Sequence, residues 1–513
     1  MSASWLNDAI FYEIYPQSFY SPSGEGVGTL KGIADKLDYI KDLGCNAIWL
    51  NPIYDSPFKD AGYDVRDYKK VAPRYGTNED AGNLFNKAHE MGIRIILDLV
   101  PGHTSEEHEW FVQSSKAEPN EYSGRYVWTD SWFKGIAGRP YIGGECERDG
   151  TYMLNFFKSQ PALNYGWLNP TESWMSSMDS PEALATRDAI RDVCDFWLTM
   201  GCDGFRVDMA DSLVKGDDEK HATALIWKDI IGSMKEKFPE SVFVAEWCYP
   251  YISINEGLFD MDFYLDHPGN GYNFLLRDYE TEGEDKSYFK ASSNSSPLKF
   301  LNQYIPAYEA TLGNGYPSLI TGNHDTNRIA YTLDETERKL AIAFILTMPG
   351  VPFIYYGDEI GMRYLEIKTH EGGYTRTGSR TPMQWDADTI KAGLSGKLYL
   401  TCDPSADAPT VVSEQTRKYS LYNTVKSLTH LRLSEKSLCA DGSFKVLFAQ
   451  ENSPLMVYSR DDLIVAVNPS VNAASCRLDI CDHKTIWSIG EGKLEDGSMM
   501  LKPQSFVVLK KKH

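Results

Sequence analysis

Four segments of the sequence place ionisable side chains at the end of a short apolar run or just after it. These side chains are Asp98 with His103, Arg206 with Asp208, Glu246, and His324 with Asp325. A charged group in an apolar strand costs free energy unless it is paired or functional. One structural Arg–Asp pair would explain one segment, but four segments of the same kind indicate an active site.

Cleavage of a glycosidic bond is a reaction that needs such carboxylates. One of them attacks or stabilises the anomeric carbon, and a second protonates the leaving oxygen. Arg206 precedes Asp208 by two residues, so both side chains leave one strand on the same side. We expect this guanidinium to keep Asp208 ionised, as a nucleophile requires. Glu246 adjoins Trp247, and partial burial would raise its pKa and suit a proton donor.

A metal site is the competing interpretation of the same acidic and histidine side chains. The sequence contains neither the H-E-x-x-H nor the H-x-H spacing that is typical of such sites. The charge of Arg206 would also repel a cation. We therefore expect no metal and no other cofactor.

Short apolar runs alternate with helical patterns from residue 9 to residue 357, which is typical of βα units on a parallel sheet. The expected strands are 9–15, 46–50, 94–100, 204–208, 242–246, 260–265, 318–322 and 353–357. The expected helices between them include 78–91, 182–200, 220–237 and 335–347. Eight strands favour a closed (β/α)8 barrel, an α/β TIM-barrel fold. A doubly wound sheet would carry a glycine-rich turn after its first strand, and none follows residue 15.

Two long insertions interrupt this pattern, at 102–168 and at about 360–412. Both leave the carboxyl ends of strands, the face on which barrels carry active sites. A last helical stretch near 413–433 precedes short alternating strands that predict an all-β module. The expected domains are a barrel of residues 1–101 and 169–437, an inserted domain of residues 102–168 and a C-terminal β domain of residues 438–513.

Composition excludes several classes of function. The net charge of −21, from 51 basic and 72 acidic residues, argues against nucleic acids and anionic membranes as partners. Nine cysteines without a C-x-x-C pair argue against a disulfide framework and a structural zinc site. The first residues lack the pattern of a signal peptide, and no apolar run approaches the roughly 18 residues of a membrane helix. We expect a cytoplasmic protein.

Several motifs together resemble the α-amylase superfamily, glycoside hydrolase family 13, from about residue 8 to the C-terminus. They are YEIYPQSF, NPIYDSPFKDAGYDVRDY, DLVPGHTS, GFRVDMAD, AEW, TGNHDTNR, YYGDEIGM and SRTPMQWD. The resemblance is strongest to the oligo-1,6-glucosidase, α-glucosidase and trehalose synthase branch. It implies a (β/α)8 barrel, a domain B between strand three and helix three, and a C-terminal antiparallel β-sandwich.

The resemblance also implies roles for individual residues. The nucleophile corresponds to Asp208, the acid/base to Glu246 and the transition-state stabiliser to Asp325. Three residues correspond to positions that hold the sugar: His103, Arg206 and His324. Tyr63 corresponds to the ring that stacks under the sugar. Asp60, with Arg376 and Arg380, corresponds to the residues that close the pocket in exo-acting members.

Departures from the family pattern limit what the resemblance implies. The loop after the first strand has Ser21, Ser23 and Thr29 where cation-binding relatives carry carboxylates or amides, and Glu25 alone is a poor calcium site. Gly102 stands where calcium-dependent amylases use Asn, which also favours a protein without a required metal. Two departures bear on specificity. Ala162 stands in place of an Asp. Met209 follows the nucleophile, where α-1,6 specialists often carry Val and α-1,4 enzymes a smaller residue.

The sequence thus predicts a retaining, exo-acting α-glucosidase that releases glucose from short α-1,4 or α-1,6 oligosaccharides. A glucosyl isomerase such as a trehalose or isomaltulose synthase would share every catalytic residue and is the alternative. A sucrose phosphorylase is disfavoured because no basic cluster is assignable to phosphate. A non-catalytic relative is disfavoured because all three carboxylates are present.

Overall fold

A computed structural model describes residues 3–136, 138–264, 269–279, 284–478 and 483–512. Eight parallel strands form its central sheet in the order β11-β10-β9-β8-β5-β2-β1-β12. They are β1 (Phe11–Ile14), β2 (Ala47–Leu50), β5 (Arg94–Leu99), β8 (Gly204–Val207), β9 (Val242–Ala245), β10 (Met261–Phe263), β11 (Tyr316–Ser318) and β12 (Phe353–Tyr355). A parallel bridge between Ile320 and Phe353 joins the two ends of this order, so the sheet closes into the expected TIM barrel.

The seventh strand differs most from the sequence prediction. It spans Tyr316–Ser318 instead of 318–322, and beyond it only Ile320 keeps a bridge to β12. The Thr321 hydroxyl accepts a hydrogen bond from the Tyr355 backbone N–H, so a side chain substitutes for the ladder there. The sixth strand was expected to reach residue 265, which lies outside the described residues.

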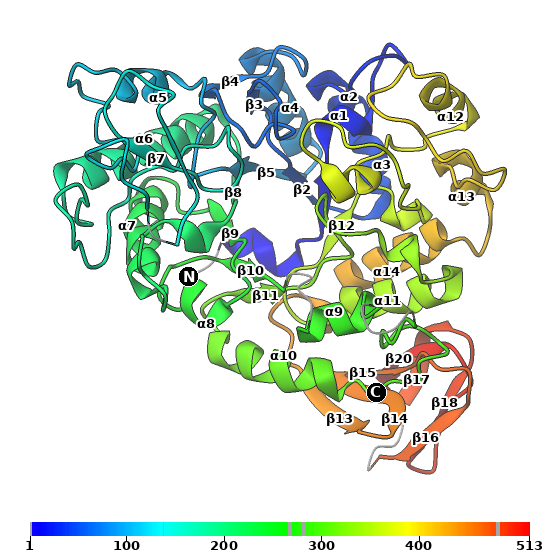
Figure 1. Cartoon of the computed structure of the whole chain (residues 1–513). Coiled ribbons are helices and arrows are strands. Elements are labelled where there is room, and N and C mark those ends of the chain that lie inside the picture. The colour runs from blue at the N-terminus through cyan, green and yellow to red at the C-terminus, as the bar shows by residue number, and fades with distance from the viewer. Residues whose placement is uncertain (1–2, 137, 265–268, 280–283, 479–482, 513) are drawn as a thin grey trace.

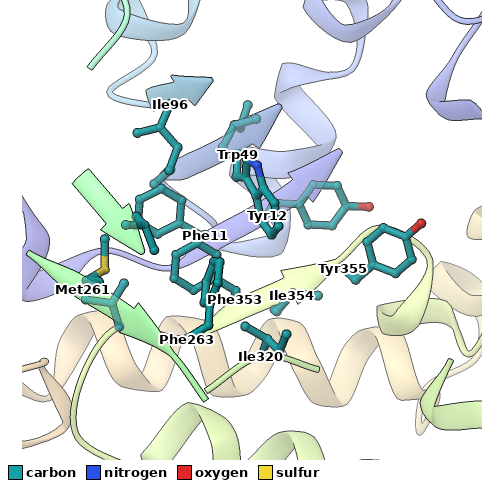
Figure 2. Packing of buried hydrophobic residues seen from close by; sticks show 14 of the residues in the cluster. Phe11, Tyr12, Trp49, Ile96, Met261, Phe263, Ile320, Phe353, Ile354 and Tyr355 are labelled. Atoms are coloured by element: carbon teal, nitrogen blue, oxygen red, sulfur yellow. The ribbon is translucent and has the colours of Figure 1, made fainter. Parts of the chain in front are cut away.

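Aromatic side chains fill the barrel interior (Figure 2). The rings of Phe11 and Phe353 stack with centroids 4.4 Å apart, and Phe263 meets Phe353 edge-on at 4.9 Å. Trp49 packs against Phe263 at 5.3 Å. Because side chains two residues apart on a strand share a face, Glu13 follows Phe11 toward the carboxyl end of the barrel. The aromatic layer therefore forms the floor on which the polar residues above it rest.

Helices surround the barrel (Figure 1). They include α4 (Asn78–Glu90), α6 (Pro181–Met200), α7 (His221–Lys237), α10 (Leu298–Thr311), α11 (Glu335–Thr347) and α14 (Leu421–Ser434). Shorter helices are α1 (Pro16–Phe19), α2 (Leu30–Asp35), α3 (Leu37–Leu43), α8 (Pro250–Ser253) and α9 (Gly271–Leu276). The four helices named from the sequence are confirmed. The stretch 413–433 divides into α13 (Val411–Thr416) and α14, because the Ser420 side chain caps α14 at the Asn423 N–H.

The two insertions lie along the top of Figure 1, at the left and at the right. The first carries α5 (Glu109–Ser114) and a hairpin of β6 (Tyr141–Gly143) and β7 (Thr151–Met153). It has a small apolar core of its own, in which Ala162 is buried beside Val127. An aspartate at position 162 would bring a charge into this cluster, so the alanine suits the packing here. The second insertion carries α12 (Ala387–Leu394).

The C-terminal residues form two antiparallel sheets, at the lower right of Figure 1. The larger has the order β13-β14-β15-β20-β17 and the smaller β16-β19-β18. Their strands are β13 (Lys445–Gln450), β14 (Ser453–Arg460), β15 (Leu463–Asn468), β16 (Ala474–Arg477), β17 (His483–Ile489), β18 (Gly492–Glu495), β19 (Ser498–Leu501) and β20 (Ser505–Lys511). One apolar cluster contains Leu455 and Val507 of the larger sheet and Met499 of the smaller, so the sheets pack on each other as a sandwich. No described helix has the length and apolar character needed to cross a membrane.

Candidate active site

Two neighbouring strands, β8 and β9, position the first two carboxylates. Asp208 follows β8, and its N–H donates to the Leu99 carbonyl at 2.8 Å; Glu246 follows β9, and its N–H donates to the Val207 carbonyl at 3.1 Å. The next residue after Asp208, Met209, has a left-handed backbone with φ of 44°. This conformation is uncommon for a residue with a side chain and often marks a functional site. Here the Met209 N–H donates to Glu246 Oε2 at 2.9 Å.

The Arg206 guanidinium lies at the centre of the site and is fully buried. Nη1 contacts Asp98 Oδ1 at 2.6 Å and Asp208 Oδ1 at 3.0 Å, and Nη2 lies 2.5 Å from Glu246 Oε1. One cation thus faces three carboxylates from adjacent strands. A buried arginine in this setting orients its partners as well as neutralising them.

Burial and Arg206 act in opposite directions on the pKa values of Asp208 and Glu246. Burial raises the pKa of Asp208 well above its ordinary value, the charge of Glu246 raises it further, and Arg206 lowers it by less. Burial also raises the pKa of Glu246 against the opposing effect of Arg206. Arg206 thus favours the ionised form of Asp208, as the sequence suggested, while burial and the charge of Glu246 act against it. Two such interacting carboxyls titrate as a pair, and this pair retains a proton to higher pH than isolated carboxyls do.

Asp325 has the opposite environment. Its Oδ1 accepts from Arg376 Nη1 at 3.0 Å and from Arg380 Nη2 at 2.7 Å. Burial raises the pKa of Asp325, but His324 and the two arginines outweigh burial and hold it well below its ordinary value. Asp325 is therefore ionised at neutral pH, in contrast to the Asp208–Glu246 pair.

Asp60 and Arg376 meet at one end of the site. Arg376 Nη2 lies 3.4 Å from Asp60 Oδ1, and the Gln160 side-chain amide donates to Asp60 Oδ2 at 2.8 Å. Burial raises the pKa of Asp60 to about 6, with Arg376 and Arg380 opposing the rise. The contact joins the loop after β2 to the second insertion, so two segments far apart in sequence close this end.

Two histidines and a tyrosine form the remaining polar wall. The Tyr63 hydroxyl lies 2.7 Å from His324 Nε2, and the two rings stack with centroids 5.2 Å apart. His103 contacts the Tyr63 carbonyl through Nε2 at 3.1 Å and the Asn155 amide nitrogen through Nδ1 at 3.0 Å. Burial lowers the pKa of His103 to about 4, so its ring is neutral at neutral pH.

These side chains surround a pocket of about 400 Å³. The predicted residues that line it are Asp60, Tyr63, His103, Asp208, Glu246, Asp325 and Arg376. The other three predicted residues are almost fully buried behind this lining: Arg206, His324 and Arg380. The lining residues without a predicted sugar contact are Phe156, Met209, Asp211 and Trp247.

Sequence reasoning missed Phe156 and Asp262. Phe156 comes from the first insertion and is 51 % exposed, and one aromatic ring in an aromatic-rich loop gives no signal of its own. Asp262 lies on β10 and accepts hydrogen bonds from the backbone N–H groups of Trp247, Cys248 and Tyr249 and from the Ser253 hydroxyl. It holds the turn that follows Glu246. The signal available for it was a carboxylate inside the predicted strand 260–265.

The sequence profile described as the α-amylase catalytic domain matches residues 13–441. The chain belongs to the α-amylase family. It is thus a carbohydrate-acting enzyme of glycoside hydrolase family 13, as its motifs indicated. Among curated members, an oligo-1,6-glucosidase of Heyndrickxia coagulans is 32 % identical over 96 % of both chains. A trehalose synthase/amylase of Mycolicibacterium smegmatis is 31 % identical over 89 % of this chain and 81 % of its own.

Solved structures of α-amylase family members share the fold over nearly the whole chain. A trehalulose synthase variant in complex with Tris aligns with a TM-score of 0.80 and 25 % identity, covering 99 % of this chain and 100 % of its own. An α-amylase from H. orenii aligns with a TM-score of 0.77 and 27 % identity at the same coverage.

Some members of the family bind a cation in the loop after the first strand, and the residues of this chain do not fit one there. The hydroxyls of Ser21 and Ser23 donate to the Glu25 carbonyl at 2.6 and 2.9 Å, so the loop satisfies that oxygen itself. Lys397 Nζ contacts Glu25 Oε1 at 2.5 Å. The Lys397 ammonium group therefore pairs with the one carboxylate of the loop, which a bound cation would need as a ligand. The described residues contain no group of three or more His, Cys, Asp or Glu side chains that could hold a metal.

Proposed function

We propose that this protein is a retaining, exo-acting α-glucosidase that releases glucose from the non-reducing end of short α-1,4 or α-1,6 oligosaccharides. The observation that supports exo action is the closure of the pocket by Asp60 and Arg376. A terminal sugar has free hydroxyls that such a pair can bind. An internal sugar would carry another glycosidic bond at that position and would meet this wall.

The proposed reaction has two displacements. Asp208 Oδ attacks the anomeric carbon while Glu246 gives its proton to the glycosidic oxygen, so the carbon–oxygen bond breaks and a glucosyl ester of Asp208 forms. Glu246, now ionised, then takes a proton from water as the water oxygen attacks the same carbon. The ester breaks, glucose leaves with its α configuration, and both carboxyls return to their first state. A pair that retains one proton suits this cycle, with that proton on Glu246.

The remaining residues position the sugar in this proposal. Asp325 is ionised and would accept hydrogen bonds from sugar hydroxyls, which strengthen as positive charge develops on the ring. Tyr63 would offer its ring face to the pyranose. Met209 and Phe156 line the pocket where the departing sugar would lie, and the adaptable shape of methionine is consistent with mixed linkage specificity.

A glucosyl isomerase is the second candidate. It is favoured by the likeness to a trehalose synthase/amylase and to a trehalulose synthase structure. Such an enzyme would form the same glucosyl ester but return the glucosyl group to the departed sugar instead of to water. The two candidates differ in whether water reaches the ester before the leaving sugar rebinds.

Product analysis distinguishes the two candidates. The purified protein is incubated with maltose, isomaltose, maltotriose, sucrose and trehalose, and products are followed by chromatography. The hydrolase proposal expects two glucose molecules for each maltose consumed. Trehalose formed from maltose, or a sucrose isomer formed from sucrose, without matching glucose would reject hydrolysis in favour of isomerisation.

A further inference from the structure

A buried carboxyl below the pocket, Glu13, has no role in the chemistry described so far. It lies on β1, in register with Trp49 on one side and Tyr355 on the other, and only 1 % of it is exposed. It is not among the lining residues of the pocket. Its position in the wall of the barrel places it beneath His324.

Glu13 contacts His324 directly. Glu13 Oε1 lies 2.9 Å from His324 Nδ1, and the Asn51 amide nitrogen donates to the same oxygen at 3.2 Å. The second ring nitrogen, Nε2, lies 3.4 Å from Asp325 Oδ2 and close to the Tyr63 hydroxyl. The imidazole therefore connects a carboxyl in the barrel to the carboxylate that faces the sugar site.

The packing around His324 fixes the plane of its ring, and the polar partners of Nδ1 and Nε2 determine which nitrogen lies on which side. Tyr63 stacks on the ring at an interplanar angle of 11°, and Tyr15 is near-parallel to it at 14° with centroids 6.3 Å apart. Trp49 meets the ring edge-on. Rotation of the imidazole would disturb these contacts. The variable that remains is which nitrogen carries the hydrogen.

The charges around the pair favour one distribution of protons. Burial raises the pKa of Glu13 well above its ordinary value, and burial lowers the pKa of His324 well below its own. Both shifts favour the neutral forms of the two groups. Among the neighbours of Glu13, Asp98 raises its pKa, whereas Asn51 and Arg206 lower it. Among the neighbours of His324, Asp325 raises its pKa, whereas Arg206, Arg376 and Arg380 lower it. Tyr355 of the neighbouring strand also faces Glu13.

A protonated carboxyl and an ionised one impose opposite tautomers on the ring. A Glu13 hydroxyl would donate to Nδ1, and the single hydrogen of the neutral ring would then be on Nε2. An ionised Glu13 would favour a hydrogen on Nδ1, in competition with the Asn51 amide nitrogen, which lies 3.1 Å from the same atom and can only donate. Nε2 would then present a lone pair toward the negative charge of Asp325.

We propose that Glu13 is a positioning residue that donates a hydrogen bond to His324 Nδ1 and so keeps the ring hydrogen on Nε2, where it serves Asp325 and a sugar hydroxyl. The part that concerns the sugar rests on the proposed function. The part that concerns the tautomer does not. Glu13 acts through His324 and does not itself touch the substrate.

Nitrogen NMR of the histidine side chains tests the tautomer directly, because protonated and unprotonated ring nitrogens have well-separated shifts. The protein is labelled with ¹⁵N at its ten histidines, and the His324 signals are assigned from their loss in a His324→Gln variant. Glu13→Gln keeps a donor toward Nδ1 and does not titrate. Glu13→Met keeps the volume and has no donor. Glu359→Gln is the matched control, since Glu359 is also fully buried but is bonded to Tyr12 and Tyr39.

We expect His324 to carry its hydrogen on Nε2 at neutral pH in the unaltered protein, in Glu13→Gln and in Glu359→Gln, and to lose this preference in Glu13→Met. A ring hydrogen on Nδ1 in the unaltered protein, or an unchanged Nε2 tautomer in Glu13→Met, would overturn the proposal. These outcomes do not depend on which glucosyl transfer the enzyme performs.

Kinetics supply a second readout on whichever glucoside the enzyme turns over. We expect kcat/KM of Glu13→Met to fall about 10- to 100-fold, by analogy with the loss of a residue that orients a metal-binding histidine. Glu13→Gln should stay within about threefold of the unaltered enzyme on this reasoning, because its amide still donates. Equal losses in Glu13→Gln and Glu13→Met would contradict a role as donor. Thermal unfolding of each variant separates these effects from loss of folding.

Discussion

Substitution of Arg376 by alanine tests the closed end of the pocket. Arg376 contacts Asp325 Oδ1 and Asp60 Oδ1 from the second insertion. In the proposed complex it donates to a hydroxyl of the terminal sugar, and a hydrogen bond from a charged donor contributes about 1.5–3 kcal/mol. Because 1.4 kcal/mol is a factor of ten, kcat/KM for maltose should fall roughly 10- to 150-fold.

The same variant should change the pH dependence in a defined direction. Arg376 lowers the pKa of Asp60, which is about 6 because burial raises it. Without Arg376 that pKa rises further. The ionised Asp60 that accepts from the sugar is then lost at a higher pH as the solution is acidified. The acidic limb of kcat/KM should therefore move to higher pH.

The assay is initial-rate glucose release from maltose and maltotriose between pH 4.5 and 8. Arg363→Ala is the matched control, because Arg363 also belongs to the second insertion but pairs with Asp403 and Asp407 away from the pocket lining. Unchanged kcat/KM in Arg376→Ala, or the same loss in Arg363→Ala, would refute the reasoning. An acidic limb that moves to lower pH would refute the assignment of Asp60.

Three further predictions follow from the site. Asp208→Asn should lower kcat by about 10⁴-fold or more while calorimetry still detects sugar binding, and near-normal turnover would reject Asp208 as nucleophile. Asp262→Ala should lower both the melting temperature and kcat. Each buried donor left unpaired costs about 1–3 kcal/mol, and the turn after Glu246 loses its acceptor. An unchanged kcat would show that this turn does not position Glu246. Chelation with EDTA should leave activity and melting temperature unchanged, because Lys397 and two serine hydroxyls hold the loop at Glu25; a fall that calcium restores would contradict this.

The gathering of the three carboxylates was predictable from sequence because strand period and strand ends have simple rules. Asp208 and Glu246 each follow a buried apolar strand, and parallel strands bring their carboxyl ends to one edge. The position of Arg206, two residues earlier, required only the alternation of side chains. Motif resemblance then pointed to Asp60 and Arg376, whose proximity local patterns could not indicate.

Other features depend on burial and on contacts between distant segments. The raised pKa of Asp208 follows from its burial in the folded protein and from the charge of Glu246, which spacing alone does not reveal. Phe156 reaches the pocket from an insertion without periodicity. The contact of Glu13 with His324 joins residues 311 positions apart, and in the sequence Glu13 is one polar residue in an apolar run.

Trapping of the glucosyl–enzyme ester tests the central claim most directly. A fluorinated α-glucosyl fluoride reacts quickly in the first step and slowly in the second, so the intermediate accumulates and its site is read by peptide mass spectrometry. The retaining mechanism proposed here predicts one fluoroglucosyl group on the peptide that contains Asp208 and none in Asp208→Asn. A label on another carboxylate, or turnover without any covalent species and with release of β-glucose, would contradict it.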